Sequence, residues 1–305
     1  MTLALAIDLG GTKVEAALVD ADGRIVPGSR TREGTGAAAA TDRAVLERAL
    51  DAVISRCAEH PGWTRVTAAG IGSAGPVDLS AGTIAPVNLP AAHGFPLVAR
   101  VARATGLDDV SLRLDGTCIA LAELWLGAAQ GAENAIVFVV STGIGGGIVS
   151  GGRLLAGASG NAGHLGQVVV AAIEGDPADS TVERLASGPH IVAWARSRGW
   201  AGRTGEDLAA DYAAGDELAR AAVARSAHAI GVGLADSATL LDLDLAVVGG
   251  GFSFVAEDFT AQIQAAARAA AVNPYASGLR VVRAALGGDA PLIGAAALVH
   301  RRDLL

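Results

Sequence analysis

Three clusters of glycine follow apolar runs in this sequence, at residues 10–11, 143–147 and 249–251. Glycine has no Cβ, so consecutive backbone N–H groups can approach a phosphate closely and form an anion-binding concavity. A single cluster of this kind is more often a tight hairpin turn. Three clusters, two of them in similar strand-turn-strand settings, favour a nucleotide held between two halves of the chain.

Other phosphate-binding patterns are absent from the sequence. It contains no Gly-x-x-x-x-Gly-Lys-[Ser/Thr], which excludes a P-loop. No cluster reads Gly-x-Gly-x-x-Gly at the start of a helix, as a dinucleotide-binding fold requires. A dehydrogenase is therefore not expected.

The composition limits the partners and the compartment. A net charge of −8 has the wrong sign for neutralising the phosphates of a nucleic acid. Although 51% of the residues are hydrophobic, no apolar run approaches the roughly 18–20 residues that span a bilayer. The N-terminus lacks the basic segment of a secretory signal. We expect a cytoplasmic protein with neither a nucleic-acid nor a membrane partner.

The elements that must position these glycines alternate between strands and helices. A length of 305 residues predicts two domains, at about 150 residues each. The alternation predicts an α/β fold with a mixed sheet in each half. The pattern of strand, glycine turn and strand at residues 3–19 recurs at residues 135–150. The expected strands are 3–7, 14–19, 66–71, 110–114, 135–140, 245–248 and 279–284, and the expected helices are 45–57, 97–105, 117–127, 216–241, 255–271 and 292–300.

Four motifs, in order along the chain, resemble those of the ROK family of sugar kinases and sugar-responsive repressors. They are Asp8-Leu9-Gly10-Gly11-Thr12-Lys13 and the segments 70–78, 141–147 and 288–296. The resemblance implies the actin-like ATPase (ribonuclease H-like) fold, with two α/β lobes and a ligand cleft between them. It places residues 1–115 and about 291–305 in an N-terminal lobe and residues 116–290 in a C-terminal lobe.

The resemblance also implies ATP and Mg²⁺ as cofactors. Asp8 would hold the Mg²⁺ through water. The residues expected at the phosphates and the adenosine are Gly10, Gly11, Thr12, Lys13, Thr142, Gly143, Gly145, Gly249 and Gly250.

The family's catalytic base is an aspartate at the end of a strand, before a helix that carries a glutamate. The segment 112–123 has this layout, so the resemblance assigns the base to Asp115. A carboxylate there would accept the proton of the attacking hydroxyl while Mg²⁺ and backbone donors stabilise the developing charge. The alternative is that Asp115 only caps the following helix. Glu123 is expected to be structural.

The sugar-facing positions depart from the family pattern. Leu114 stands where the family has an Asn that contacts sugar hydroxyls, so one hydroxyl loses its partner or is absent or inverted. His164 replaces a sugar-contacting Glu, as also occurs in N-acetylmannosamine kinases, and Gln167 replaces the family's His. A second alignment pairs His164 with that His, but an expected strand at 168–170 then aligns poorly.

The family's His is also a zinc ligand, together with three cysteines of a nearby loop. The corresponding segment 174–183 has no cysteine, and the only two cysteines of the chain, Cys57 and Cys118, lie elsewhere. We therefore expect no structural zinc. Glu183 matches the glutamate that ends the family's motif and is expected to contact the substrate. Two further substrate-facing positions are Gly75 and Asn88, and Asn88 has the alternative role of ordering a turn.

The nucleotide-facing positions match the family and the sugar-facing ones differ, so we expect ATP chemistry on a changed substrate. The predicted protein is a kinase that phosphorylates a primary hydroxyl of a hexose-like molecule. The resemblance to the family implies a homodimer, and the sequence itself leaves the oligomeric state open. The acceptor remains open among an amino sugar (kanosamine or N-acetylmannosamine), a sugar-like C7 cyclitol and glucose, and the donor between ATP and polyphosphate. The alternative is a catalytically silent sugar sensor. A DNA-binding repressor is not expected, because the first strand begins at Leu3.

Overall fold

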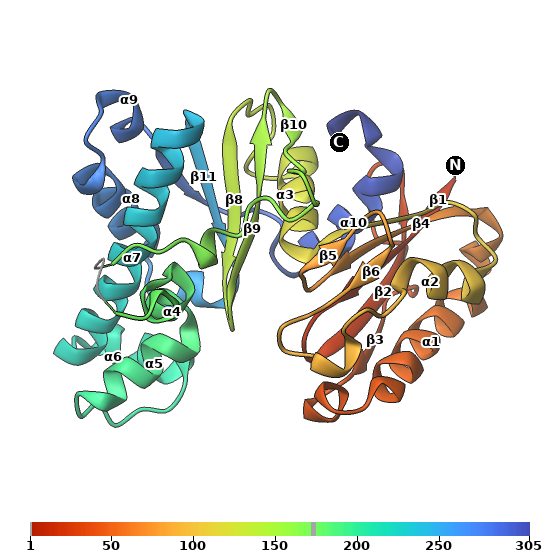
Figure 1. Ribbon diagram of the computed structural model, residues 1–305, viewed down its shortest axis with the longest axis horizontal. Helices are drawn as coiled ribbons and strands as arrows, with labels where there is room; N and C mark the ends of the chain where they lie inside the picture. The colour runs from red at the N-terminus through yellow and green to blue at the C-terminus, as the bar shows by residue number, and fades with distance from the viewer. Residues whose placement is uncertain (1, 172–174) are drawn as a thin grey trace. The chain divides into compact units, whose positions relative to one another are not determined.

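Figure 1 shows the computed structural model, which describes residues 2–171 and 175–305. The chain divides into two compact units. The first comprises Met1–Gln130, Arg153–Ala162 and Gly288–Leu305, and the second Gly131–Gly152 and Gly163–Gly287.

These units differ from the predicted lobes, which divide the chain after residue 115 and near residue 291. Helix α3 (Asp115–Leu126) belongs to the first unit. The reason is its packing against α10 (Ala290–His300), which lies in that unit as well. The sequence marks where α3 begins but not which sheet it covers.

The first unit is built on a five-stranded mixed sheet of order β3-β2-β1-β4-β7. β1 (Leu3–Leu9) pairs antiparallel with β2 (Lys13–Asp20) and parallel with β4 (Val66–Ser73). β7 (Val110–Leu114) continues the sheet parallel to β4, and β3 (Thr31–Gly34) lies antiparallel to β2. Every residue of β1 is buried, as expected for a central strand covered on both faces.

The second unit repeats this strand arrangement. β9 (Ile144–Ser150) pairs antiparallel with β8 (Ala135–Val140). β11 (Leu245–Gly249) lies parallel to β8 on its other side, and β12 (Arg280–Arg283) lies parallel to β11. The predicted recurrence of strand, glycine turn and strand is confirmed, and so is a mixed sheet in each half.

Helices and short elements complete both units (Figure 1). The first unit also holds α1 (Arg43–Glu59), α2 (Leu97–Thr105), β5 (Val77–Asp78), β6 (Thr83–Ile84) and β10 (Arg153–Leu154). The second also holds α4 (Val182–Ala186), α5 (Gly188–Ser197), α6 (Gly205–Ala214), α7 (Glu217–Leu241), α8 (Phe259–Ala270) and α9 (Pro274–Ser277). In the part of the chain that the structure describes, no helix has the length and apolar character needed to cross a membrane.

Two predicted elements are wrong in extent. The helix expected over 255–271 is a 3₁₀ turn, η6 (Gly251–Phe254), followed by α8, which begins only at Phe259. The strand expected at 168–170 forms a single bridge, between Val169 and Thr181. The backbone of this segment hydrogen-bonds with Ser180 and with Val182, where α4 begins, and Val169 is 45% exposed.

Helix α10 packs at the centre of the first unit against α3, β4 and β1. Eight of its residues are buried, which its almost wholly apolar sequence allows. Glycine permits backbone contact at two points. A Cβ on Gly294 would lie 1.7 Å from the carbonyl oxygen of Cys118, and one on Gly70 would lie 1.8 Å from that of Ala295.

We predict that Gly294→Ala destabilises the protein by about 2 kcal/mol, because the main chain of α3 cannot yield as a flexible side chain would. Urea denaturation measures the loss. Gly205→Ala is the matched control, since a Cβ at the start of α6 would meet only Phe252, at 3.8 Å. It should change stability by no more than about 0.5 kcal/mol. Equal stability of the two variants would contradict the close contact of α10 with α3.

Candidate active site

The turn between β1 and β2 brings a buried carboxylate to the edge of the first sheet. The Gly10 amide donates to the Lys13 carbonyl oxygen at 3.0 Å, which closes the turn. Asp8, two residues before it, is 7% exposed and lies in register with Glu15 on β2 and Gly72 on β4. The Asp8 carboxyl on this central strand therefore has little access to water.

Asp115 lies at the same edge of the sheet. β1 and β7 both run parallel to the strand between them, so the carboxyl ends of these strands meet there. The N-cap position of α3 belongs to Leu114, and Asp115 is the first helical residue. Its carboxylate accepts a hydrogen bond from the Gly116 amide at 2.7 Å. The simple N-cap role considered for Asp115 does not fit this geometry.

The two carboxyls share a poorly solvated environment. Burial raises the pKa of Asp115 to about 6. Burial, and next the negative charge of Asp115, raise the pKa of Asp8 to about 7, while the Lys13 ammonium acts in the opposite direction. Two acidic groups that resist ionisation together favour a cation beside them. The two carboxyls therefore supply oxygen donors that fit a hard divalent cation.

Glu15, on β2 next to the turn, pairs with three positively charged side chains, which the sequence did not predict. Its buried carboxylate accepts hydrogen bonds from Lys13 at 2.7 Å, Arg30 at 2.5 Å and Arg32 at 3.0 Å. Burial alone would raise the pKa of Glu15, but the hydrogen bonds from Lys13 and Arg30 outweigh it and hold that pKa below its usual range. A charged residue inside the apolar run 14–19 is the signal that could have revealed it.

The substrate-facing residues predicted in the first unit are Gly75, Asn88 and Leu114, and each takes part in a close contact with a glycine. A Cβ on Gly11 would come within 1.8 Å of Nδ2 of Asn88, so that amide lies directly on the β1–β2 turn. A Cβ on Gly75 would come within 2.2 Å of Cδ2 of Leu114. Leu114 is 2% exposed and offers no hydrogen bond where an Asn would.

In the second unit, Glu183 braces the glycine turn between β8 and β9. The Ser141 amide donates to the Gly143 carbonyl oxygen at 2.9 Å. Oε2 of Glu183 accepts a hydrogen bond from the Ile144 amide at 2.7 Å, and a Cβ on Gly143 would lie 2.6 Å from the same oxygen. The carboxylate thus fixes the segment that contains Thr142, Gly143 and Gly145.

His164 and Gln167 lie beside this carboxylate. Gln167 donates from Nε2 to Oε1 of Glu183 at 3.4 Å. Burial lowers the pKa of His164, and the negative charge of Glu183 partly opposes this shift. The structure therefore brings the three predicted substrate-facing residues of the second unit together. A neutral imidazole there can both donate and accept a hydrogen bond.

The third glycine cluster lies next to the second. β11 ends at Gly249, opposite Val139 of the parallel strand β8. Gly250 has a φ of 85°, and a Cβ there would lie 2.4 Å from the Val140 carbonyl oxygen. Only glycine fits so close to another backbone. Two of the three clusters thus end neighbouring strands of one sheet, and the Gly10–Gly11 turn belongs to the other unit.

The counterpart of the family's zinc loop is only partly described by the structure, from residue 175 on. Among residues 2–171 and 175–305, no group of three or more His, Cys, Asp or Glu side chains could hold a metal ion. Glu174, at the start of that loop, lies outside the described residues. The absence of zinc remains a prediction from the sequence.

Comparison with known proteins decides the family. A model of the ROK family matches residues 4–302. The chain belongs to the ROK family. It is 34% identical over 304 residues to the N-acetylmannosamine kinase of Escherichia coli O157:H7, and the match covers 98% of this chain and 99% of that kinase.

Solved structures agree. A ROK hexokinase from Thermus thermophilus superposes with a TM-score of 0.81 at 33% identity over 97% of both chains. A ROK glucokinase from Streptomyces griseus, in complex with glucose and AMPPNP, gives a TM-score of 0.82 at 30% identity over 98% of this chain and 99% of that one. The predicted actin-like ATPase fold is confirmed by these ROK structures.

We predict that Asp8→Asn stabilises the metal-free protein at pH 8 and much less at pH 5. The pKa of Asp8 is raised on folding, so the wild type loses stability as pH rises from about 4 to about 7, and an amide does not titrate. The gain at pH 8 should be about 1–3 kcal/mol, below the roughly 4 kcal/mol that a shift of three pKa units sets as a limit.

Thermal unfolding in EDTA at the two pH values measures this difference. Asp22→Asn, at an exposed turn of the same unit, is the control and should show no pH-dependent gain. A uniform effect of Asp8→Asn at both pH values, or a loss at pH 8, would contradict the raised pKa.

Proposed function

We propose that this protein is an ATP-dependent kinase that transfers a phosphoryl group to the primary hydroxyl of a hexose-like sugar. One observation carries the proposal. The buried carboxyls of Asp8 and Asp115 end parallel strands at one edge of the first sheet, beside the Gly10–Gly11 turn. A phosphoryl-transfer site needs a base for the hydroxyl, a carboxylate for a metal ion and backbone donors for phosphate.

Asp115 is the proposed base. A pKa of about 6 leaves most of its carboxyl ionised at pH 7 to 8, while its basicity exceeds that of an ordinary aspartate. The hydrogen bond from the Gly116 amide uses one oxygen and fixes the orientation of the group. The second oxygen then has capacity to accept the proton of a sugar hydroxyl.

The nucleotide is held by backbone groups in this proposal. Gly11 and Thr12 offer main-chain donors to the phosphates, and Gly10 closes the turn that presents them. Lys13, oriented by Glu15, adds a positive charge. Asp8 would hold Mg²⁺ through water, and the ion would neutralise charge on the phosphates. The nucleotide-facing residues of the second unit are Thr142, Gly143, Gly145, Gly249 and Gly250. The complex of the Streptomyces griseus relative with AMPPNP supports ATP as the donor.

N-acetylmannosamine is the proposed acceptor. The Escherichia coli relatives that match this chain along nearly its whole length are named as kinases of that sugar. His164 agrees, because N-acetylmannosamine kinases also carry His at the corresponding position. The buried Leu114 leaves one position of the ring without a hydrogen-bond partner, which favours a sugar other than glucose. Kanosamine, a C7 cyclitol and glucose are the other acceptors to test.

Asp115→Asn should lower kcat by about 10³-fold, since it removes the base but keeps the size of the side chain and an oxygen that can accept the hydrogen bond from the Gly116 amide. KM for the sugar should stay within a few-fold of the wild type. A coupled assay of ADP release, run over the four acceptors, measures both constants. Asp108→Asn, at an exposed position before β7, is the control and should leave kcat unchanged.

The assay also separates the kinase from a silent sensor. A sensor would bind a sugar in calorimetry yet release no ADP with any acceptor. Turnover that persists in Asp115→Asn would remove Asp115 from the role of base.

Leu114→Asn should shift specificity toward glucose. A new amide offers the hydrogen bond that Leu114 lacks, and one such bond in a buried site corresponds to about a tenfold change. The ratio of kcat/KM for glucose to that for N-acetylmannosamine is the measurement, because it does not depend on the amount of folded protein. Leu114→Met is the control. An unchanged ratio in Leu114→Asn would show that this position does not face the sugar.

A further inference from the structure

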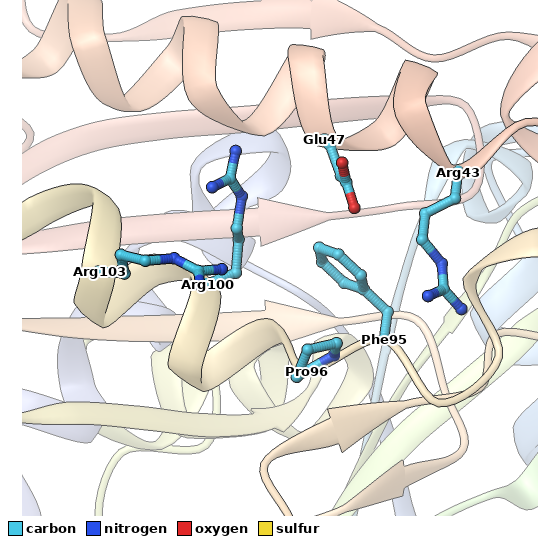
Figure 2. Close-up of a pocket in the computed structure, with 6 residues that line it drawn as sticks. All are labelled: Arg43, Glu47, Phe95, Pro96, Arg100 and Arg103. Carbon is cyan, nitrogen blue, oxygen red and sulfur yellow. The ribbon is translucent and has the colours of Figure 1, made fainter.

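A cavity of about 220 Å³ lies between α1 and α2 of the first unit (Figure 2). None of the residues assigned above to nucleotide or sugar lines it. We call it the α1–α2 pocket. Its lining residues are Arg43, Glu47, Phe95, Pro96, Arg100 and Arg103.

Helical spacing concentrates positive charge in this pocket. Arg43 and Glu47 are four residues apart on α1, and Arg100 and Arg103 are three apart on α2, so each pair lies on one helix face. Three guanidinium groups and a single carboxylate line the walls. Such an excess of cations is unexpected in a chain with a net charge of −8.

Several donors in the pocket lack acceptors. Arg100 pairs through Nη2 with Asp51 of α1, yet its Nε is buried without a hydrogen-bond partner. Arg103 forms no hydrogen bond or ion pair with any residue that the structure describes. Arg103 is exposed and supplies charge, whereas Nε of Arg100 is a buried donor. A buried donor without an acceptor costs free energy, so an occupant that supplies an oxygen atom to Arg100 would be stabilised here.

Arg43 is held in place before any occupant arrives. Its Nε donates to the Ala91 carbonyl oxygen at 3.0 Å, and its Nη2 donates to that of His93 at 2.9 Å. Its guanidinium carbon lies 5.9 Å from the centre of the Phe95 ring. Figure 2 shows that ring between Arg43 on one side and Arg100 and Arg103 on the other. A preorganised arginine loses less entropy when it binds an anion.

We propose that the α1–α2 pocket binds a phosphate dianion, as free inorganic phosphate or as the phosphate group of a phosphomonoester. Guanidinium groups match the oxygens of phosphate in geometry and charge. Pro96, the N-cap residue of α2, has no side chain that could cap the helix, so the positive end of the helix dipole adds to the attraction. The Glu47 carboxylate opposes binding and sets a moderate affinity.

Titration of the full-length protein with inorganic phosphate, followed by calorimetry at constant ionic strength, tests this proposal. Glucose 6-phosphate is titrated in parallel, and tighter binding of one of the two identifies the source of the phosphate group. Arg103→Gln should weaken binding about tenfold, because it removes a cation that pairs with none of the residues the structure describes. Glu47→Gln should tighten binding a few-fold, because it removes the opposing charge.

Arg48→Gln is the matched control, since Arg48 lies on α1 next to Glu47 but does not line the pocket. It should leave the dissociation constant unchanged.

Opposite shifts of the dissociation constant in Arg103→Gln and Glu47→Gln support the site, and the second variant suffices if the first fails to fold. The proposal would be overturned if neither ligand bound at about 20 mM, a concentration twenty times the roughly 1 mM dissociation constant of a weak complex. Binding that neither variant changes would also overturn it, because the anion would then occupy another site. Neither result depends on catalysis, so failure here leaves the proposed kinase activity untouched.

Discussion

The burial of two neighbouring carboxyls, Asp8 and Asp115, is the constraint on which the candidate site depends. Both side chains would be easier to ionise in water, and burial raises the pKa of each. The two groups are buried side by side because the parallel strands that carry them end at one edge of the sheet. This placement disfavours the ionised form of each. A site that resists two negative charges is one that a cation stabilises, and a kinase supplies that cation with its nucleotide.

Close contacts to the backbone of three glycines define the rest of the site. The Asn88 amide lies on Gly11, the Glu183 carboxylate lies on Gly143, and Gly250 packs on the end of β8. Each contact would be lost if the glycine carried a Cβ. The absence of a Cβ at these glycines thus has two effects. It leaves backbone N–H groups accessible to phosphate, and it makes room for the neighbouring group that fixes the turn.

The sequence predicts the local structure well and the long-range contacts poorly. The apolar run of β1 and the repeated strand, glycine turn and strand are visible because buried strands need continuous apolar residues. Glu15 was missed because its partners Arg30 and Arg32 lie 15 and 17 residues away in the sequence, just before β3 and on it. The contact of Gly143 with Glu183 joins residues 40 positions apart, so no local pattern announces it. The α3–α10 packing moved the predicted boundary for the same reason.

A crystal structure with Mg²⁺, AMPPNP and N-acetylmannosamine would test the central claim most directly. The account predicts that a carboxylate oxygen of Asp115 lies about 2.6–3.2 Å from the primary hydroxyl of the sugar. It also predicts that Asp8 contacts the water shell of the metal ion. A sugar hydroxyl aimed at the terminal phosphate with Asp115 out of hydrogen-bonding reach would contradict it.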